Sequence, residues 1–334
     1  MKVLIAPDKF KGTVSATEVA QSIAEAIVDS HEVIIQPLAD GGEGTLEIFG
    51  GGNKISVVAG PLGKPVKASW RLEGKSAVIE MAQASGLHLI QDKSFANPID
   101  ASTFGTGELI RTALERGAED IFIGLGGSAS IDGGLGALQA MRPLKRYSSI
   151  EINVACDVRT GFIECAGVFG PQKGATDTQI RFLENRLRRL AQVFHEERNI
   201  DVTSLPMAGA AGGLAGGLAT VGANLQSGFE AVSERVHLVD QIEDADLVIT
   251  GEGEVNESSF DGKVVGEVLK LSKLMSTPVL VIAGSIDSNV RLPVPSYSLK
   301  EHVGLEEAFS APAKSIAKIS MKALDDWSVN HSKG

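Results

Sequence analysis

A strand, a capped helix and a second strand at the start of the chain restrict its fold more than any other feature. Lys2–Pro7 is an apolar segment with the composition of a buried strand, and Ser15-Ala-Thr-Glu18 has the pattern of a capping box that begins a helix. Val33–Leu38 is a second apolar segment. This succession places the two strands parallel, with the helix crossing one face of their sheet. The sequence therefore predicts an α/β fold.

The pattern of apolar and polar residues changes near residue 60 and returns to its earlier form near residue 241. Val66–Leu72 alternates like a half-buried strand, whereas Leu247–Thr250 is again wholly apolar apart from its last residue. We therefore expect a Rossmann-like parallel-sheet domain formed by both chain ends (residues 1–60 and 241–334). Residues 61–240 would form an inserted second α/β (α+β) domain.

Charge and composition limit the partners. Acidic residues number 42 and basic residues 31, a net charge of −11, which disfavours nucleic acid and anionic membranes as main partners. Cys156 and Cys165 form no metal-binding pair, which fits a reducing cytosol. The first apolar run ends too early for a signal peptide, and Met207–Leu225 has too few large apolar residues for a membrane helix. We expect a cytoplasmic protein, and the sequence is compatible with a homodimer.

Three polar loops with glycine follow predicted strands of the first domain, at Asp8–Gly12, Asp40–Thr45 and Gly251–Glu254. Ligands bind beyond the C-terminal ends of the strands in open parallel sheets, so these loops are candidates for one site. Lys9 and Lys11 precede a predicted helix, whose N-terminus favours an anion. The two lysines would hold a carboxylate or a transferred phosphate, and the alternative is a pair of solvated surface lysines.

The second and third loops contribute carboxylates. Asp40 and Glu43 are hard oxygen ligands that suit Mg²⁺, although Asp40 could equally stabilise a turn. Glu252 follows an apolar strand, and Lys263 precedes a helix. For this last pair, helix capping by Asp261 and a solvent-exposed lysine are the competing explanation.

The inserted segment offers further glycine loops. Gly126–Gly134 has many backbone N–H groups, as a phosphate cradle needs, and Lys173 lies in a rigid turn before a helix. Thr103–Glu108 places hydroxyls at a helix start, where capping is the simpler explanation for Thr106. No P-loop motif is present, and the dinucleotide-like pattern at Gly124–Ala129 is too loose to favour an oxidoreductase.

Short motifs, most of them rich in glycine, are spread over most of the chain. They are Ala6–Gly12, Pro37–Thr45, Gly60–Gly63, Glu80–Ala82, Thr103–Ile110, Gly126–Ala129, Asp132–Gly134, Ala155–Val158, Phe169–Ala175, Ala208–Gly213, Ile249–Gly253 and Gly262–Lys263.

In this order the motifs resemble the glycerate kinase family of the two-domain α/β type, known as type 1. The resemblance implies two α/β domains with the active site in the cleft between them. It also implies transfer of the ATP γ-phosphate to a hydroxyl of D-glycerate, with ATP and Mg²⁺ as cofactors. It does not distinguish the 2-hydroxyl from the 3-hydroxyl.

The resemblance, read with the chemistry of phosphoryl transfer, assigns roles to the candidate residues. Lys9 and Lys11 would bind the substrate carboxylate or the transferred phosphate. Asp157 or Asp8 would orient or deprotonate the hydroxyl. The remaining assignments are Asp40 and Glu43 near the metal, and Thr103, Gly126, Gly127, Ser128, Asp132, Lys173, Glu252 and Lys263 as substrate or phosphate contacts.

A few positions depart from the family pattern. The family usually continues Gly-Glu-Gly with Arg, then Asp, then Gln-Ser, whereas Glu254, Asn256 and Ser258-Ser259 stand here. The first change reverses a charge, and the second removes a potential metal ligand or base. The sequence therefore leaves a second hypothesis open, a member with weak or no catalysis that binds glycerate or a nucleotide as a sensor or scaffold.

Overall fold

The computed structural model describes residues 1–90, 98–156 and 158–331 and divides into two compact units. The first unit contains Met1–Asp40 and Val232–Gly334, and the second contains Gly41–Ala231. Each unit combines a sheet with helices, which confirms the predicted α/β class. The boundary expected near residue 60 lies inside the second unit, because strands β3 (Lys54–Ala59) and β4 (Pro65–Glu73) on either side of it pair with each other.

The first unit is built on a five-stranded sheet in which all strands are parallel. In spatial order the strands are β13 (Ser296–Ser298), β11 (Val279–Ala283), β9 (Leu247–Thr250), β1 (Lys2–Ile5) and β2 (Glu32–Ile35). Both β9 and β11 are buried at every residue, whereas the edge strands β2 and β13 are partly exposed. This is the pattern of a parallel sheet with helices on both faces.

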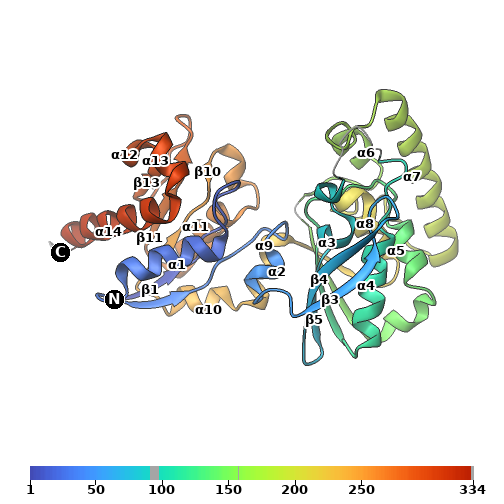
Figure 1. Cartoon of the computed structure of the whole chain (residues 1–334), viewed down its shortest axis with the longest axis horizontal. Coiled ribbons are helices and arrows are strands. Elements are labelled where there is room, and N and C mark those ends of the chain that lie inside the picture. The colour runs from blue at the N-terminus through green and yellow to red at the C-terminus, as the bar shows by residue number, and fades with distance from the viewer. Residues whose placement is uncertain (91–97, 157, 332–334) are drawn as a thin grey trace. The chain divides into compact units, whose positions relative to one another are not determined.

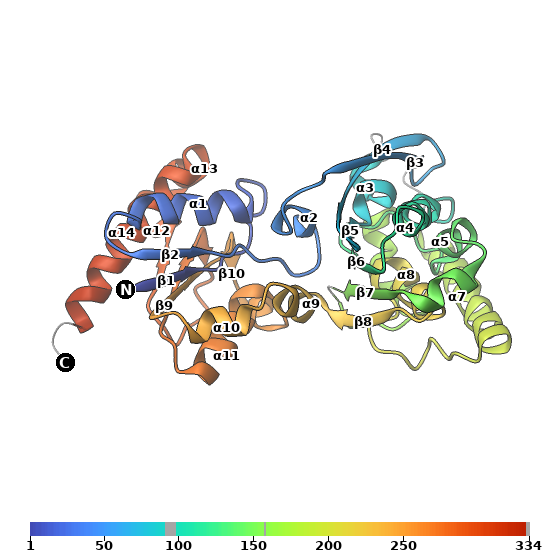
Figure 2. The same cartoon turned by 90° about the horizontal axis from the view of Figure 1, so that it is seen from below.

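Helices cover both faces of this sheet (Figure 2). On one face α1 (Ala16–Ile27) packs against α14 (Pro312–His331), and the other face carries α10 (Leu238–Glu243) and α11 (Val264–Met275). Helix α9 (Gly228–Arg235) contains the point at which the chain passes from the second unit into the first. The smaller elements are β10 (Glu254–Val255), β12 (Ser285–Ile286), η5 (Glu257–Phe260), α12 (Leu299–Val303) and α13 (Leu305–Ser310).

The start of α1 follows the predicted capping box. The Glu18 backbone N–H donates to Ser15 Oγ at 3.3 Å, and the Ser15 N–H donates to Glu18 Oε2 at 2.8 Å, so two N–H groups that the helix leaves unpaired are satisfied. Ile23 on the buried side of α1 belongs to the same core as Ile319 of α14 and the inner residues of the strands. Burying one such side chain contributes about 2 kcal/mol, so this amphipathic face fixes the helix on the sheet.

The second unit contains a six-stranded mixed sheet in the order β3-β4-β5-β6-β7-β8. The pairs β3–β4 and β4–β5 are antiparallel, and the remaining pairs are parallel. The alternating Val66–Leu72 segment predicted β4. The other four strands of this sheet are β5 (Ser76–Glu80), β6 (Asp120–Gly124), β7 (Glu151–Cys156) and β8 (Asn224–Ser227).

The helices of the second unit form two layers on one face of its sheet, while α2 lies on the other face (Figures 1 and 2). Helices α3, α4 and α8 contact strands, and α5, α6 and α7 pack outside them. Helix α7 buries one apolar face, which consists of Leu183, Leu187, Leu190, Ala191 and Phe194. The bounds are α2 (Thr45–Ile48), α3 (Ala82–Ser85), α4 (Phe104–Glu115), α5 (Leu135–Ala140), α6 (Cys165–Phe169), α7 (Asp177–Arg198), α8 (Ala210–Ala219), η1 (Leu87–Leu89), η3 (Leu144–Ser149) and η4 (Pro171–Lys173).

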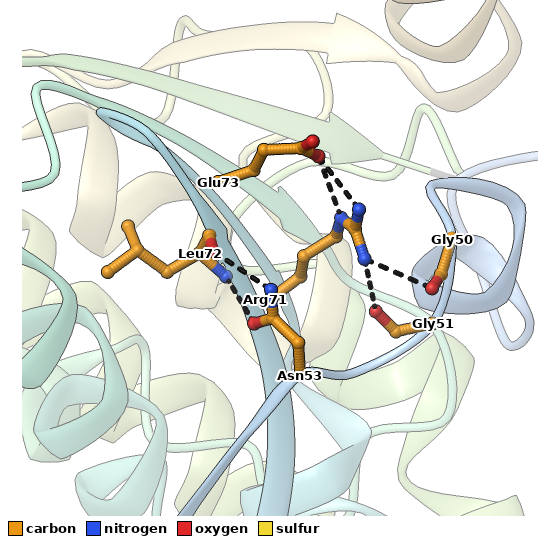
Figure 3. Close-up of polar contacts among 6 residues, drawn as sticks. All are labelled: Gly50, Gly51, Asn53, Arg71, Leu72 and Glu73. Atoms are coloured by element: carbon orange, nitrogen blue, oxygen red, sulfur yellow. Dashed lines mark hydrogen bonds and ion pairs between the residues drawn. The ribbon is translucent and has the colours of Figure 1, made fainter.

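Side chains help to hold the segment before β3 on β4, in addition to the backbone hydrogen bond from the Asn53 N–H to the Trp70 carbonyl oxygen (Figure 3). The Arg71 guanidinium donates to the carbonyl oxygens of Gly50 at 3.0 Å and Gly51 at 3.3 Å. The Asn53 side chain both donates to the Leu72 carbonyl and accepts from the Leu72 N–H, each at 2.9 Å. Asn53 thereby extends the ladder by one step and sets the register in which β3 begins.

The uncharged Met207–Leu225 segment contains a buried, left-handed turn near the start of α8. Ala211, Gly212 and Gly213 have φ values of 52°, 67° and 89°. A Cβ at Gly212 would lie 2.0 Å from the Ser130 carbonyl oxygen, so only glycine allows this close approach. Within the three described ranges, none of the helices combines the length and apolarity needed to cross a bilayer.

Candidate active site

The site lies where the connections of the first unit's sheet change direction. From β1 the chain continues to β2 on one side, while its neighbour on the other side is β9, which leads on to β11 (Figure 2). In such sheets the adjoining loops diverge and leave a crevice for a ligand. Asp8 follows β1 and Glu252 follows β9, and the Asp8 N–H donates to the Gly251 carbonyl oxygen at 2.8 Å. The sheet therefore presents two acidic side chains at this crevice.

The crevice is a pocket of about 560 Å³ within the first unit. Six of the predicted site residues line it, five from the three loops and Lys263 from the position before α11, so the structure brings these segments together. They are Asp8, Lys9, Lys11, Asp40, Glu252 and Lys263.

Lys9 lies between two carboxylates of this pocket. Its Nζ is 3.8 Å from Asp8 Oδ1 and 3.9 Å from Asp40 Oδ1. Its backbone N–H also donates to Asp8 Oδ1 at 2.7 Å. One ammonium group thus offsets part of the negative charge of two carboxylates that come from different loops.

Asp8 is buried, and its acidity is changed by that burial. Loss of hydration raises the pKa of Asp8 to about 7; the Lys9 ammonium opposes the rise, and the carboxylates of Asp40 and Glu252 add to it. A carboxyl group that titrates near neutral pH can accept a proton from a hydroxyl and later release it. Asp8 therefore has the properties of a general base.

Glu252 is a buried carboxylate with one unsatisfied oxygen. Burial raises the pKa of Glu252, while a hydrogen bond from Ser259 and the charge of Lys263 oppose the rise. Oε1 accepts no hydrogen bond from any group of the described residues, although only 8% of the residue is exposed. A buried acceptor left unpaired costs about 1–3 kcal/mol, so this oxygen suits a donor group of a ligand.

The carboxylates fit Mg²⁺ bound together with phosphate, but they do not form an all-protein cage. Over the part of the chain that is described, no three His, Cys, Asp or Glu residues are grouped to hold a metal. Mg²⁺ needs only one or two carboxylates when waters and phosphate oxygens complete its octahedron. Asp40 lines the pocket, whereas the exposed Glu43 belongs to the second unit and is not among the lining residues.

A second pocket, lined by a buried lysine, lies at the end of β6 in the second unit. Lys173 is only 4% exposed, and its Nζ donates to Ser128 Oγ at 2.7 Å and to the Ser130 carbonyl oxygen at 2.8 Å. Lys173, Gly127 and Ser128 line a pocket of about 250 Å³. Gly126 is not among the lining residues, and it allows close backbone packing, because a Cβ there would lie 2.5 Å from the Gly42 Cα.

Thr103 and Asp132, both predicted as ligand contacts, are hydrogen-bonded to each other. Asp132 Oδ2 accepts from the Thr103 N–H at 2.8 Å and from Thr103 Oγ1 at 2.9 Å, and the carboxylate also accepts from the N–H groups of Gly134 and Gly136. Thr103 is fully buried. We therefore infer that this pair holds the Gly126–Gly134 loop against α4. The contact joins two segments that are distant in the sequence, so the pattern of either loop alone could not predict it.

Two further loop residues singled out in the sequence are Asp157 and Asn256. Asp157, a candidate base, lies outside the described residues. Asn256, which stands where the family usually has Asp, caps η5, because its Oδ1 accepts from the Ser258 N–H at 3.0 Å and from Ser258 Oγ at 2.7 Å. Residues of α12 and α13 also line the pocket of the first unit, although no motif in the sequence pointed to them.

The fold and the pockets indicate the general class of the protein. A parallel sheet with lysines and carboxylates at its switch point is the arrangement of an α/β protein that binds a small anionic molecule. The sequence model of the Glycerate kinase family matches residues 3–143 and 141–324. The chain belongs to the glycerate kinase family, and the resemblance seen in its motifs is confirmed.

Individual relatives are similar over nearly the whole chain. The Escherichia coli K12 protein named glycerate 2-kinase is 39% identical, covering 96% of each chain. The Bacillus subtilis 168 glycerate kinase is 40% identical over 86% of this chain and 87% of the relative. A solved structure of a protein assigned as glycerate kinase 2 in Salmonella typhimurium LT2 superposes with a TM-score of 0.86 at 36% identity, covering 99% of each chain.

Proposed function

We propose that this chain is a kinase that transfers the γ-phosphate of ATP to the 2-hydroxyl of D-glycerate in the presence of Mg²⁺. Membership of the family and relatives named glycerate kinase support the reaction. The E. coli relative is named a glycerate 2-kinase, which favours the 2-hydroxyl.

The observation that carries the proposal is the pairing of buried Asp8 with Lys9 at the switch point. A base for a sugar-acid hydroxyl needs a pKa near the working pH, and the pKa of Asp8 is raised to about 7. Phosphoryl transfer otherwise depends on positioning and on neutralising charge, which lysines in the same pocket supply.

Each residue of the pocket has its own role in phosphoryl transfer. Asp8 accepts the proton of the hydroxyl while the hydroxyl oxygen forms a bond to the γ-phosphorus and the bond to the bridging oxygen of ADP breaks. Lys9 and Lys11 hold the transferred phosphoryl group. Mg²⁺, when bound, offsets the charge of the phosphates, and Asp40 would hold it from the protein side. Asp157 stays the alternative base.

The second unit would hold another anionic group of the substrates. Lys173, Ser128 and Gly127 line its pocket, and Lys173 Nζ donates to Ser128 Oγ. A buried ammonium favours an anion such as a carboxylate or a phosphate, because a charge removed from water is stabilised by an opposite charge.

The test is an assay for ADP release that depends on D-glycerate. We expect turnover with D-glycerate and Mg²⁺, little with L-glycerate, and none when the metal is removed with a chelator. Phosphorus NMR of the product should show the ester on carbon 2 rather than carbon 3. ATP binding by calorimetry without any glycerate-dependent release would contradict the proposal and favour a nucleotide-binding sensor.

A further inference from the structure

The pocket of the first unit has an apolar wall as well as a charged one. Two residues of that wall, Leu305 and Phe309, are 57% and 62% exposed, although both are large and apolar. They are four residues apart on α13, so they lie on the same side of the helix. The wall consists of Leu299, Leu305, Ala308 and Phe309.

The size of the pocket also exceeds what a three-carbon acid needs. D-glycerate has seven non-hydrogen atoms and no apolar group larger than a CH₂, so it would fill a small part of about 560 Å³ and leave the apolar wall in water. A ligand that fits the whole pocket has a charged end and a flat apolar end. A nucleoside triphosphate has both.

The charged wall supports the same ligand independently. Lys263 Nζ donates to Ser258 Oγ at 2.8 Å just before the N-terminus of α11, and Lys263 and Lys300 both line the pocket, as phosphate contacts would. Glu252 Oε1 is buried and accepts no bond from the described residues, and a ribose hydroxyl is a suitable donor for it.

We infer that this pocket holds the nucleotide, with its base against Leu305 and Phe309 of α13 and its phosphates toward the lysines. The inference rests on the proposed kinase function and adds the location and the recognition of the base. Stacking on an aromatic ring tolerates different bases, so the site would accept GTP with a KM within about tenfold of that for ATP.

The test is Phe309→Ala with Phe309→Tyr beside it and Phe182→Ala as a matched control. Phe182 is 53% exposed on α7 and lines none of the pockets described above. We expect Phe309→Ala to raise the KM for ATP roughly tenfold while the KM for D-glycerate changes less than twofold. Phe309→Tyr should retain the wild-type KM, and Phe182→Ala should have no effect.

Three outcomes would overturn the inference: an unchanged KM for ATP in Phe309→Ala, an equal rise in both KM values, or a change only in self-association measured by light scattering. Calorimetric titration of ATP into wild type and Phe309→Ala gives the same comparison without turnover. If wild type releases no ADP with glycerate, the kinase proposal fails. The difference in ATP affinity would still decide the position of the nucleotide.

Discussion

Asp8 and Lys9 interact twice, because the Lys9 backbone N–H donates to Asp8 Oδ1 at 2.7 Å and Lys9 Nζ lies 3.8 Å from the same oxygen. The first contact fixes the carboxylate within its own loop. The second lowers the free energy of its charged form, which burial raises. The balance between these effects places the titration of Asp8 close to neutral pH, and several consequences can be measured.

The pH dependence of turnover should report Asp8. A base acts in its deprotonated form, so kcat/KM should fall as the pH falls through about 7, the pKa of Asp8. Asp8→Asn should lower kcat/KM about 10²–10⁴-fold and abolish this limb of the profile. Asp325→Asn, at an exposed position of α14, serves as the control. A wild-type profile retained in Asp8→Asn would exclude Asp8 as the base.

The same residue should destabilise the fold at high pH. The pKa of Asp8 is about 7 when folded and about 3.9 in an unfolded chain, so the folded state binds more protons between these values. Stability contributed by this group therefore falls as the pH rises from about 4 to 7. Asp8→Asn should raise the free energy of unfolding at pH 8 by up to about 4 kcal/mol and leave it nearly unchanged near pH 4. Urea denaturation at both pH values measures the difference; an equal effect at both would contradict this linkage.

Glu252→Gln should shift the acid limb of the profile. The negative charge of Glu252 contributes to raising the pKa of Asp8, so an isosteric neutral residue should lower that pKa. We expect the limb to move to lower pH by a few tenths of a unit to one unit, measured from kcat/KM against pH. A limb that does not move would show that Glu252 is protonated at neutral pH and does not act through its charge.

Lys9→Ala should remove turnover. Its ammonium is 3.8 Å and 3.9 Å from two carboxylates, so its loss leaves their repulsion uncompensated and removes a cation that would hold the phosphoryl group. We expect kcat to fall at least about 10²-fold, and residual activity to require higher pH because the pKa of Asp8 rises further. Lys318→Ala, exposed on α14, is the matched control, and an unchanged rate in Lys9→Ala would remove Lys9 from the site.

The sequence predicted those parts of the fold and site that depend on neighbours along the chain. Ser15 and Glu18 formed the expected cap, and the loops after β1 and β9 contain the expected charges, because local pattern determines both features. The pairing of Thr103 with Asp132 joins residues 29 positions apart, so no local pattern contains it. Phe309 was missed for a related reason, since an exposed apolar side chain on a helix gains meaning only from the pocket beside it.

The close approach of Gly212 to Ser130 provides a test that compares two glycines with similar backbones. Gly212 and Gly222 have φ values of 67° and 92°, so alanine at either position incurs the backbone cost of a left-handed conformation, about 1 kcal/mol. A Cβ at Gly222 would meet nothing within 4 Å, whereas at Gly212 it would lie 2.0 Å from the Ser130 carbonyl oxygen. We therefore expect Gly212→Ala to lower the free energy of unfolding by at least about 3 kcal/mol more than Gly222→Ala, measured by urea denaturation.

The same two variants also test the pocket around Lys173, because the Ser130 carbonyl accepts from Lys173 Nζ at 2.8 Å. Displacing that carbonyl should move Lys173, so Gly212→Ala should raise the KM for at least one substrate at a temperature where it stays folded. Gly222→Ala should leave both KM values unchanged. Equal stabilities of the two variants would mean that the left-handed turn can shift away from Ser130, and that Gly212 is not required to support the loop that carries Ser128.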